Sequence, residues 1–92
     1  MTAEQKATIL AALKVDLGIK TTAYDERLGQ IINASADMIA TEGASLDYSD
    51  VQDVQLIVMY AAWLWRRRDT GDGMPRMLRY ALNNKVLGDK MQ

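Results

Sequence analysis

"LIVMYAAWLWRRR", residues 56–68, is apolar at every position until it ends in three arginines. A helix that packs on one side needs an apolar stripe of only about 100°, whereas this run is apolar around nearly its whole circumference. It therefore predicts a long central helix that must be covered on almost all sides. Two explanations stay open: the rest of the chain buries the run, or neighbouring copies complete the cover.

The segments on either side of this run also show helical spacing, and none reads as a convincing strand. Helices are expected over about residues 3–16, 24–42, 50–68 and 75–87. Thr2 and Gln5 form a capping-box pattern at the start of the first helix, and Gly18 and Gly43 are expected to end the first two helices. The fold class that follows is all-α, a compact bundle of about four helices in one domain that spans residues 1–92.

The third and fourth helices are framed by acidic, proline and glycine residues. Asp47 and Ser49 are the candidate N-caps of the third helix, and Asp50 and Asp53 fall in its first turn, where the helix dipole favours carboxylates. Three aspartates spaced three apart also resemble a metal cluster, but no calcium-loop pattern is present, so capping explains them better and no metal is expected. The fourth helix follows the loop "DTGDG", starts at Pro75, ends at Gly88, and carries Met77, Leu78, Ala81 and Leu82.

Composition narrows the possible functions. The chain has no cysteine and no histidine, which removes disulfides, thiolate catalysis, ordinary zinc sites and imidazole acid–base chemistry. The triplet "DTG" at residues 69–71 also occurs in aspartic proteases, but that chemistry needs paired rigid β-loops, and a solvated turn is the better interpretation. We therefore expect no enzymatic activity, no catalytic residue and no cofactor.

Targeting signals are also missing from the sequence. The N-terminal stretch lacks the pattern of a signal peptide, so we expect the protein to stay in the compartment where it is made. The longest apolar run, Val54–Trp65, is interrupted only by Gln55 and has about 12 residues, whereas a membrane-spanning helix needs about 20. No membrane partner is expected.

The aromatic residues of the apolar run are the strongest candidates for contacts between copies. Trp63 and Trp65 point about 200° apart around the helix axis, so one can fill the core while the other serves an interface. Truncating the core tryptophan to alanine should lower stability by about 3 to 5 kcal/mol, and truncating the other should mainly impair assembly. The predicted oligomer interface comprises Leu56, Met59, Tyr60, Trp63 and Trp65.

The arginines allow two interpretations. At the end of a helix they complement the negative pole of its dipole. Alternatively they project with Lys85 of the fourth helix toward DNA phosphates or an acidic partner. The residues in question are Arg66, Arg67, Arg68, Arg76 and Arg79. A small helical nucleic-acid-binding or regulatory module that uses them is the alternative function, although a net charge of −1 argues against a wholly DNA-binding surface.

Taken in order, the chain resembles the small head–tail connector proteins of tailed bacteriophages, also described as DNA-packaging or head-completion proteins. The residues that carry the resemblance are "LKVDLGI" at 13–19, "YDERLGQIINASADMI" at 24–39, "DVQLIVMYAAWLWRRR" at 53–68 and "MPRMLRYALNNKV" at 74–86. The shared pattern is a succession: a short helix ending in leucine and glycine, a helix opening with aspartate, a long apolar helix ending in arginine, and a last helix after a loop.

The resemblance implies a structural protein in a virion or prophage. Such a subunit forms a ring of about twelve copies, a dodecamer built from contacts between two different faces. The ring docks on the portal protein, extends the DNA channel toward a tail or stopper protein, and touches packaged double-stranded DNA transiently. Its place would be the head–tail junction of the virion, and the host cytoplasm during assembly. The chain departs from the family pattern in having three arginines and a second tryptophan.

Overall fold

The computed structural model describes residues 1–71 and 73–90, except for the side chains of residues 68–70. Every regular element in these ranges is a helix, which confirms the all-α prediction. The four helices are α1 (Ala3–Leu17), α2 (Asp25–Thr41), α3 (Val51–Thr70) and α4 (Arg76–Lys90).

The start and end signals of α1 act as predicted. The backbone N–H of Gln5 donates to the Thr2 hydroxyl over 3.1 Å, and the Thr2 N–H donates to the Gln5 side chain over 2.9 Å. These reciprocal bonds satisfy two donors that a helix start otherwise leaves unpaired. Gly18 closes the helix in the left-handed conformation, with φ of 72°, which glycine adopts at no steric cost.

The inner face of α2 consists of residues at helical spacing. Leu28, Ile31, Ile32, Ser35 and Ile39 are all buried. The Ser35 hydroxyl donates to the Ile31 carbonyl over 2.7 Å, so this buried polar side chain has the partner that burial requires.

The start of α3 differs from the prediction. Asp50 is the N-cap, because its carboxylate accepts the backbone N–H of Gln52 over 2.8 Å. Asp47 instead folds the preceding loop by accepting both the N–H and the hydroxyl of Ser49. The prediction of Asp47 or Ser49 as the cap was therefore wrong, because three closely spaced polar residues compete for one capping position.

Two predicted ends were also wrong. The loop "DTGDG" was expected to begin at residue 69, but α3 continues through Thr70 and ends at Gly71, with φ of 69°. Gly88 was expected to end α4, yet the helix continues to Lys90. A glycine inside a helix costs only about 1 kcal/mol, and an ion pair between Lys85 and Asp89 spans this turn. The start of α4 also differs slightly from the prediction, because the helix begins at Arg76 and not at Pro75, a shift of about one residue.

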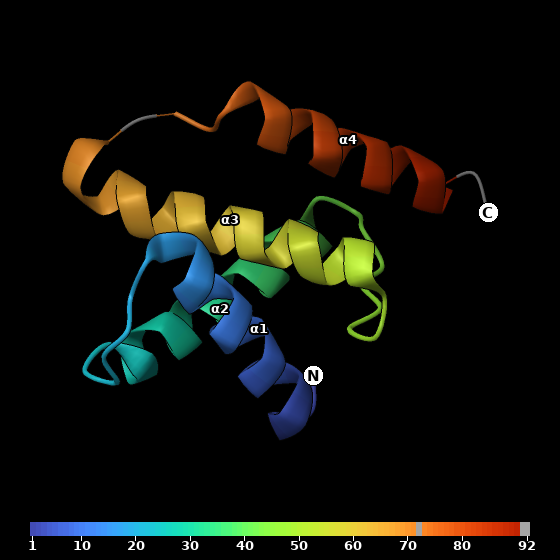
Figure 1. Ribbon diagram of the computed structural model, residues 1–92. Coiled ribbons are helices and arrows are strands. Elements are labelled where there is room, and N and C mark those ends of the chain that lie inside the picture. Colours follow the sequence, from blue (N-terminus) through green and yellow to red (C-terminus); the bar gives the residue numbers. More distant parts are fainter. Residues whose placement is uncertain (72, 91–92) are drawn as a thin grey trace.

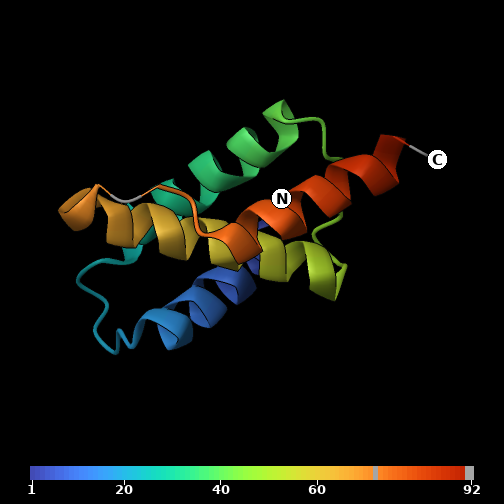
Figure 2. The ribbon, with the colours of Figure 1, turned by 90° about the horizontal axis from the view of Figure 1, so that it is seen from above.

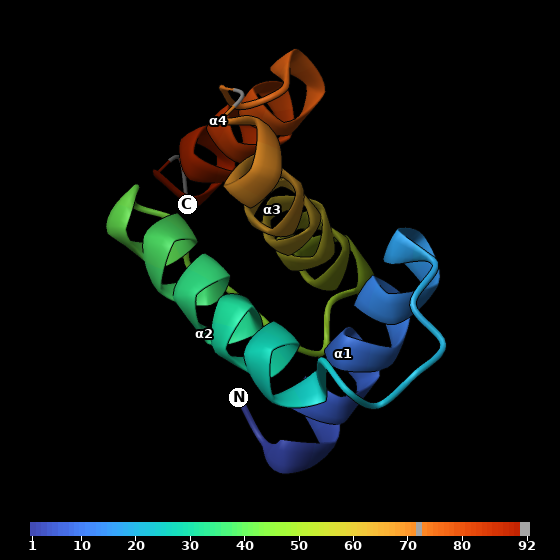
Figure 3. The same cartoon turned by 90° about the vertical axis from the view of Figure 1, so that its left-hand side faces the viewer.

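The helices pack around α3 (Figures 1 and 3). α1 and α2 lie against one side of α3, and α4 lies against the other. Seen from above, α4 runs back along α3 as its antiparallel neighbour (Figure 2). The buried core draws on all four helices and includes Ile9, Leu13, Leu28, Ile32, Ile39, Ile57, Leu78 and Leu82.

The chain itself covers most of the apolar run, which favours the first of the two explanations left open by the sequence. From Val54 to Trp65 every side chain except Gln55 is buried or half-buried, because α1, α2 and α4 pack on different sides of α3. Leu56 and Tyr60, predicted at an oligomer interface, are core residues of the single chain. The run therefore gives no reason of its own for assembly, and any surface for contacts between copies must be sought elsewhere.

Candidate assembly surface

The face of α4 that points away from α3 carries large exposed apolar side chains. Met77 is 78 %, Tyr80 62 % and Leu87 59 % exposed. At about 100° per residue these three fall within about 80° of one another, so they form one stripe. Leu78 and Leu82, which are buried, lie on the opposite side of the helix axis. We call Met77, Tyr80 and Leu87 the α4 stripe; α4 is thus apolar on both sides.

The α4 stripe was not predicted from the sequence. Met77 and Leu78 were expected together on the fourth helix, but neighbouring residues point about 100° apart, and a helix that packs on one side buries only part of its circumference. Leu78 packs inward and Met77 remains in solvent. The available signal was the spacing of Met77, Tyr80 and Leu87, which lie on a second helical face beside the buried one, with the polar Asn84 between them.

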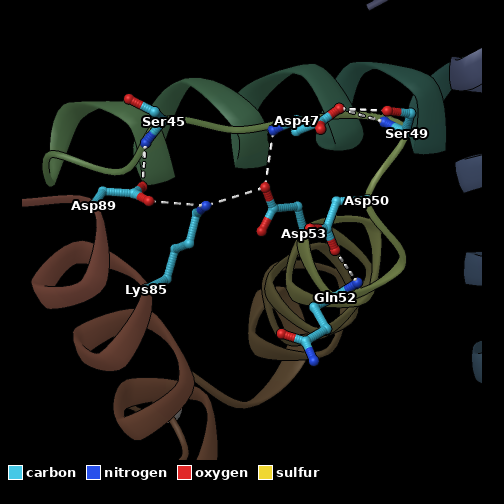
Figure 4. A network of polar contacts seen from close by, with 8 residues as sticks. All are labelled: Ser45, Asp47, Ser49, Asp50, Gln52, Asp53, Lys85 and Asp89. Carbon is cyan, nitrogen blue, oxygen red and sulfur yellow. Dashed lines mark hydrogen bonds and ion pairs between the residues drawn. The ribbon is translucent and has the colours of Figure 1, made fainter. Parts of the chain in front are cut away.

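A polar network fixes the second half of α4 to the rest of the chain (Figure 4). The Lys85 ammonium lies 3.2 Å from a carboxylate oxygen of Asp53 and 3.1 Å from one of Asp89. Asp89 also accepts the Ser45 N–H over 2.6 Å, and Asp53 accepts the Asp47 N–H over 2.9 Å. The network joins α4, the start of α3 and the loop between α2 and α3. Lys85 therefore does not project toward a partner, as the alternative interpretation of the basic residues required.

The network changes the acidity of its members. The backbone N–H of Ser45 holds the pKa of Asp89 below its ordinary value, with help from Lys85. Hydrogen bonds from the hydroxyl and the backbone of Ser49 lower the pKa of Asp47. Partial burial acts to lower the pKa of Lys85, but its hydrogen bonds to Asp89 and Asp53 outweigh burial and raise the pKa. All of these shifts favour the charged forms, and therefore the closed network.

The two tryptophans contact different parts of the chain. The Trp63 indole N–H donates to the Gly73 carbonyl over 3.1 Å and the ring packs edge-on against Tyr60. Trp65 packs edge-on against Tyr24, at the start of α2. They diverge as their spacing predicts, but both are half-buried, so the expected division into one core and one exposed tryptophan is not observed. Trp63 ties the loop before α4 to α3.

The arginine side chains that the structure describes make separate contacts. Arg66 lies 3.7 Å from the carboxylate of Asp16, and Arg79 lies 2.8 Å from that of Glu42. Arg67 stacks over the Trp63 ring, 5.1 Å from its centre. Arg76 is exposed at the start of α4, and the side chain of Arg68 lies outside the described residues. The placement of the four described arginine side chains gives no support for a single phosphate site.

Grooves run along the seam between α3 and α4. One, of about 640 Å³, lies beside the start of α3 and is lined by Val51, Leu56, Met59, Ala81, Asn84 and Lys85. The other, of about 440 Å³, lies near the end of α3 and includes Met59, Trp63, Arg66 and Met77. No cluster of three potential metal-binding side chains occurs among the described residues. No described helix has the length and apolar character needed to cross a lipid bilayer.

No protein-family model, curated protein or solved structure matches this chain.

Proposed function

We propose that the protein is the structural subunit of a bacteriophage head–tail connector ring that docks on the portal and extends the DNA channel toward the tail. The observation that carries the proposal is the two-sided apolar character of α4. One side anchors the helix to α3 through Leu78 and Leu82, and the other presents the α4 stripe to solvent. Exposed apolar residues that gather on one helical face mark interaction sites more often than isolated ones do.

The proposal also draws on the succession of helices that the chain shares with connector proteins. A ring subunit needs two different faces, because heterologous contacts close into a ring only when one face meets another. A net charge of −1 suits the wall of a channel through which DNA slides, since many phosphate contacts would hold the duplex tightly. Arg66 and Arg79 already form ion pairs with carboxylates, so they are less available to hold DNA phosphates, which also suits a channel wall.

Sedimentation velocity over a concentration series tests the proposal. The wild-type chain is expected to form a large, discrete species as the concentration rises. Leu87→Glu, which places a charge on the α4 stripe, should abolish that species, while Gln55→Glu, at an exposed position of α3, should leave it unchanged. Circular dichroism checks that both variants keep the helical fold. If Leu87→Glu self-associates as strongly as Gln55→Glu and the wild type do, the role proposed for the α4 stripe is contradicted.

A further inference from the structure

Helix α4 contributes little to the common core. Its buried residues are Leu78 and Leu82, whereas α2 supplies seven buried residues. The other three helices pack against one another in pairs, while α4 packs mainly against α3. Figure 3 shows α4 on the far side of α3 from α1. Because α1, α2 and α3 share a core of their own, α4 is the helix that can leave as a unit without unfolding the rest.

The surface that holds α4 is specific for this helix. Three polar pairs fix the register of α4: Arg79 with Glu42, Lys85 with Asp53, and Asp89 with the backbone N–H of Ser45. Figure 4 shows the last two pairs. Glu42, Ser45 and Asp53 lie between the end of α2 and the first turn of α3, and we call the surface that they define the α4 seat. An α4 helix from a second copy would find the same partners there.

The turn at Gly71 decides where α4 goes. Gly71 ends α3 in the left-handed conformation, with φ of 69°, and its N–H donates to the Arg67 carbonyl. A Cβ built at Gly71 would meet no described atom within 4 Å other than those of its chain neighbours, so side-chain packing does not hold the turn. Glycine adopts positive and negative φ with similar ease. A change at this one residue therefore redirects α4 away from its own α3.

We propose that α4 is exchanged between copies through the turn at Gly71, so that the α4 helix of one copy occupies the α4 seat of the next. The inference rests on the proposed ring and specifies its repeating contact. Exchange remakes the contacts between α4 and its seat, so the linked copies differ from a closed copy mainly at the turn. Because helix and seat are different surfaces, the contact is heterologous and repeats from copy to copy until a ring closes. The α4 stripe stays exposed for further contacts.

Cross-linking between chains tests the exchange in the full-length protein, which has no cysteine of its own. Ser45→Cys labels the seat and keeps the backbone N–H that donates to Asp89. Lys90→Cys labels α4, because Cε of Lys90 lies 3.7 Å from the position of a Cβ at Gly43, two residues before Ser45. Both labelled positions are exposed, so a short bis-maleimide reagent reaches them. The two single variants are mixed in urea and refolded together.

Exchange brings the seat of one chain to the α4 helix of another, so a covalent dimer of one chain of each variant is expected. The control is a mixture of Lys20→Cys with Lys90→Cys, because Lys20 precedes α2 and the seat follows it, so the two lie at opposite ends of that helix. The yield of the dimer should exceed that of the control at least about five-fold, since exchange raises the effective concentration of the two thiols. A chain that carries both Ser45→Cys and Lys90→Cys should give a ladder of larger multimers.

A pair of glycine substitutions tests the turn itself. Gly71→Ala in both chains should raise the dimer yield about five-fold, because alanine disfavours the left-handed conformation that a closed copy requires. Gly88→Ala is the matched control, since Gly88 lies within α4 and a Cβ there would also meet no described atom within 4 Å. It should leave the yield unchanged. Equal yields from the two variants would overturn the role of Gly71.

The remaining outcomes separate this proposal from the proposed function. Closed rings in electron micrographs, with links between chains no more frequent than in the control, would show that the ring stands and that α4 stays on its own α3. Frequent links between chains without rings would support the exchange and contradict the ring. If neither rings nor links above the control form, the proposed function and the exchange both fail.

Discussion

The ammonium of Lys85 lies 3.2 Å from the carboxylate of Asp53, and this pair links the last helix to the start of α3. Asp53 is only 4 % exposed, so its charge needs the partner that α4 brings. Trp63 ties the loop at Gly73 to α3 near the other end of α4. Held near both ends, α4 presents the α4 stripe to solvent in a fixed orientation.

Asp53→Ala should destabilise the subunit by about 1 to 3 kcal/mol, because it removes the acceptor of the Asp47 N–H and leaves Lys85 short of one partner. Urea unfolding followed by circular dichroism measures the loss. Asp37→Ala, at an exposed position of α2, is the matched control and should change stability by less than about 0.5 kcal/mol. Equal effects of the two substitutions would show that the network adds no stability.

The network also predicts how stability depends on pH. Asp89 and Asp47 have folded-state pKa values below the ordinary 3.8, so their contribution is complete above that value and is lost as the pH falls through the lowered pKa. Lys85 has a raised pKa, so its contribution is complete below the ordinary 10.5 and is lost as the pH rises through the raised value. Urea midpoints should therefore fall in strong acid and in strong base.

Asp89→Asn tests the acid side of this dependence. The amide keeps an acceptor for the Ser45 N–H but no longer titrates, so the variant should be less stable than the wild type near neutral pH and should lose less stability below about pH 4. Parallel pH profiles for the variant and the wild type would mean that Asp89 contributes nothing to acid sensitivity.

Two leucines of α4 should separate folding from assembly. Leu82 is fully buried, so Leu82→Ala should cost about 2 to 5 kcal/mol of unfolding free energy. Leu87 is 59 % exposed, so Leu87→Ala should cost under about 0.5 kcal/mol and yet shift self-association to higher protein concentration. Thermal unfolding and sedimentation of both variants measure the two effects. A large loss of stability in Leu87→Ala would place it in the core and not on an assembly surface.

Duplex DNA should bind weakly. Among the candidate arginines whose side chains are described, Arg66 and Arg79 are held by Asp16 and Glu42, which leaves Arg67 and Arg76 for phosphates. The logarithm of affinity against the logarithm of salt concentration should therefore have a slope of about −2 or shallower. A slope of about −4 or steeper that flattens on replacing Arg67 and Arg76 by alanine would favour the nucleic-acid-binding alternative.

Local signals in the sequence predicted much of the fold. The capping box at Thr2 and the glycine at residue 18 each act within a turn of helix, and each was confirmed. Gly88 did not end α4 as predicted. A glycine inside a helix costs about 1 kcal/mol of stability, which is less than the stabilisation that packing and the Lys85–Asp89 ion pair give to the last turn.

The candidate surface could not be predicted from the sequence, because it depends on contacts between residues that are far apart along the chain. How completely α3 is covered depends on where three other helices pack, so the apolar run alone could not decide between core and interface. The pairing of Lys85 with Asp53 joins residues brought together only by the turn before α4. The α4 stripe became recognisable once Leu78 and Leu82 fixed which side of α4 faces inward.

Negative-stain electron microscopy of the purified wild-type chain, over a concentration series, is the decisive experiment for the proposed ring. Closed rings of uniform size with a central opening are the expected result. A compact monomer at every concentration, or filaments that never close, would rule the ring out.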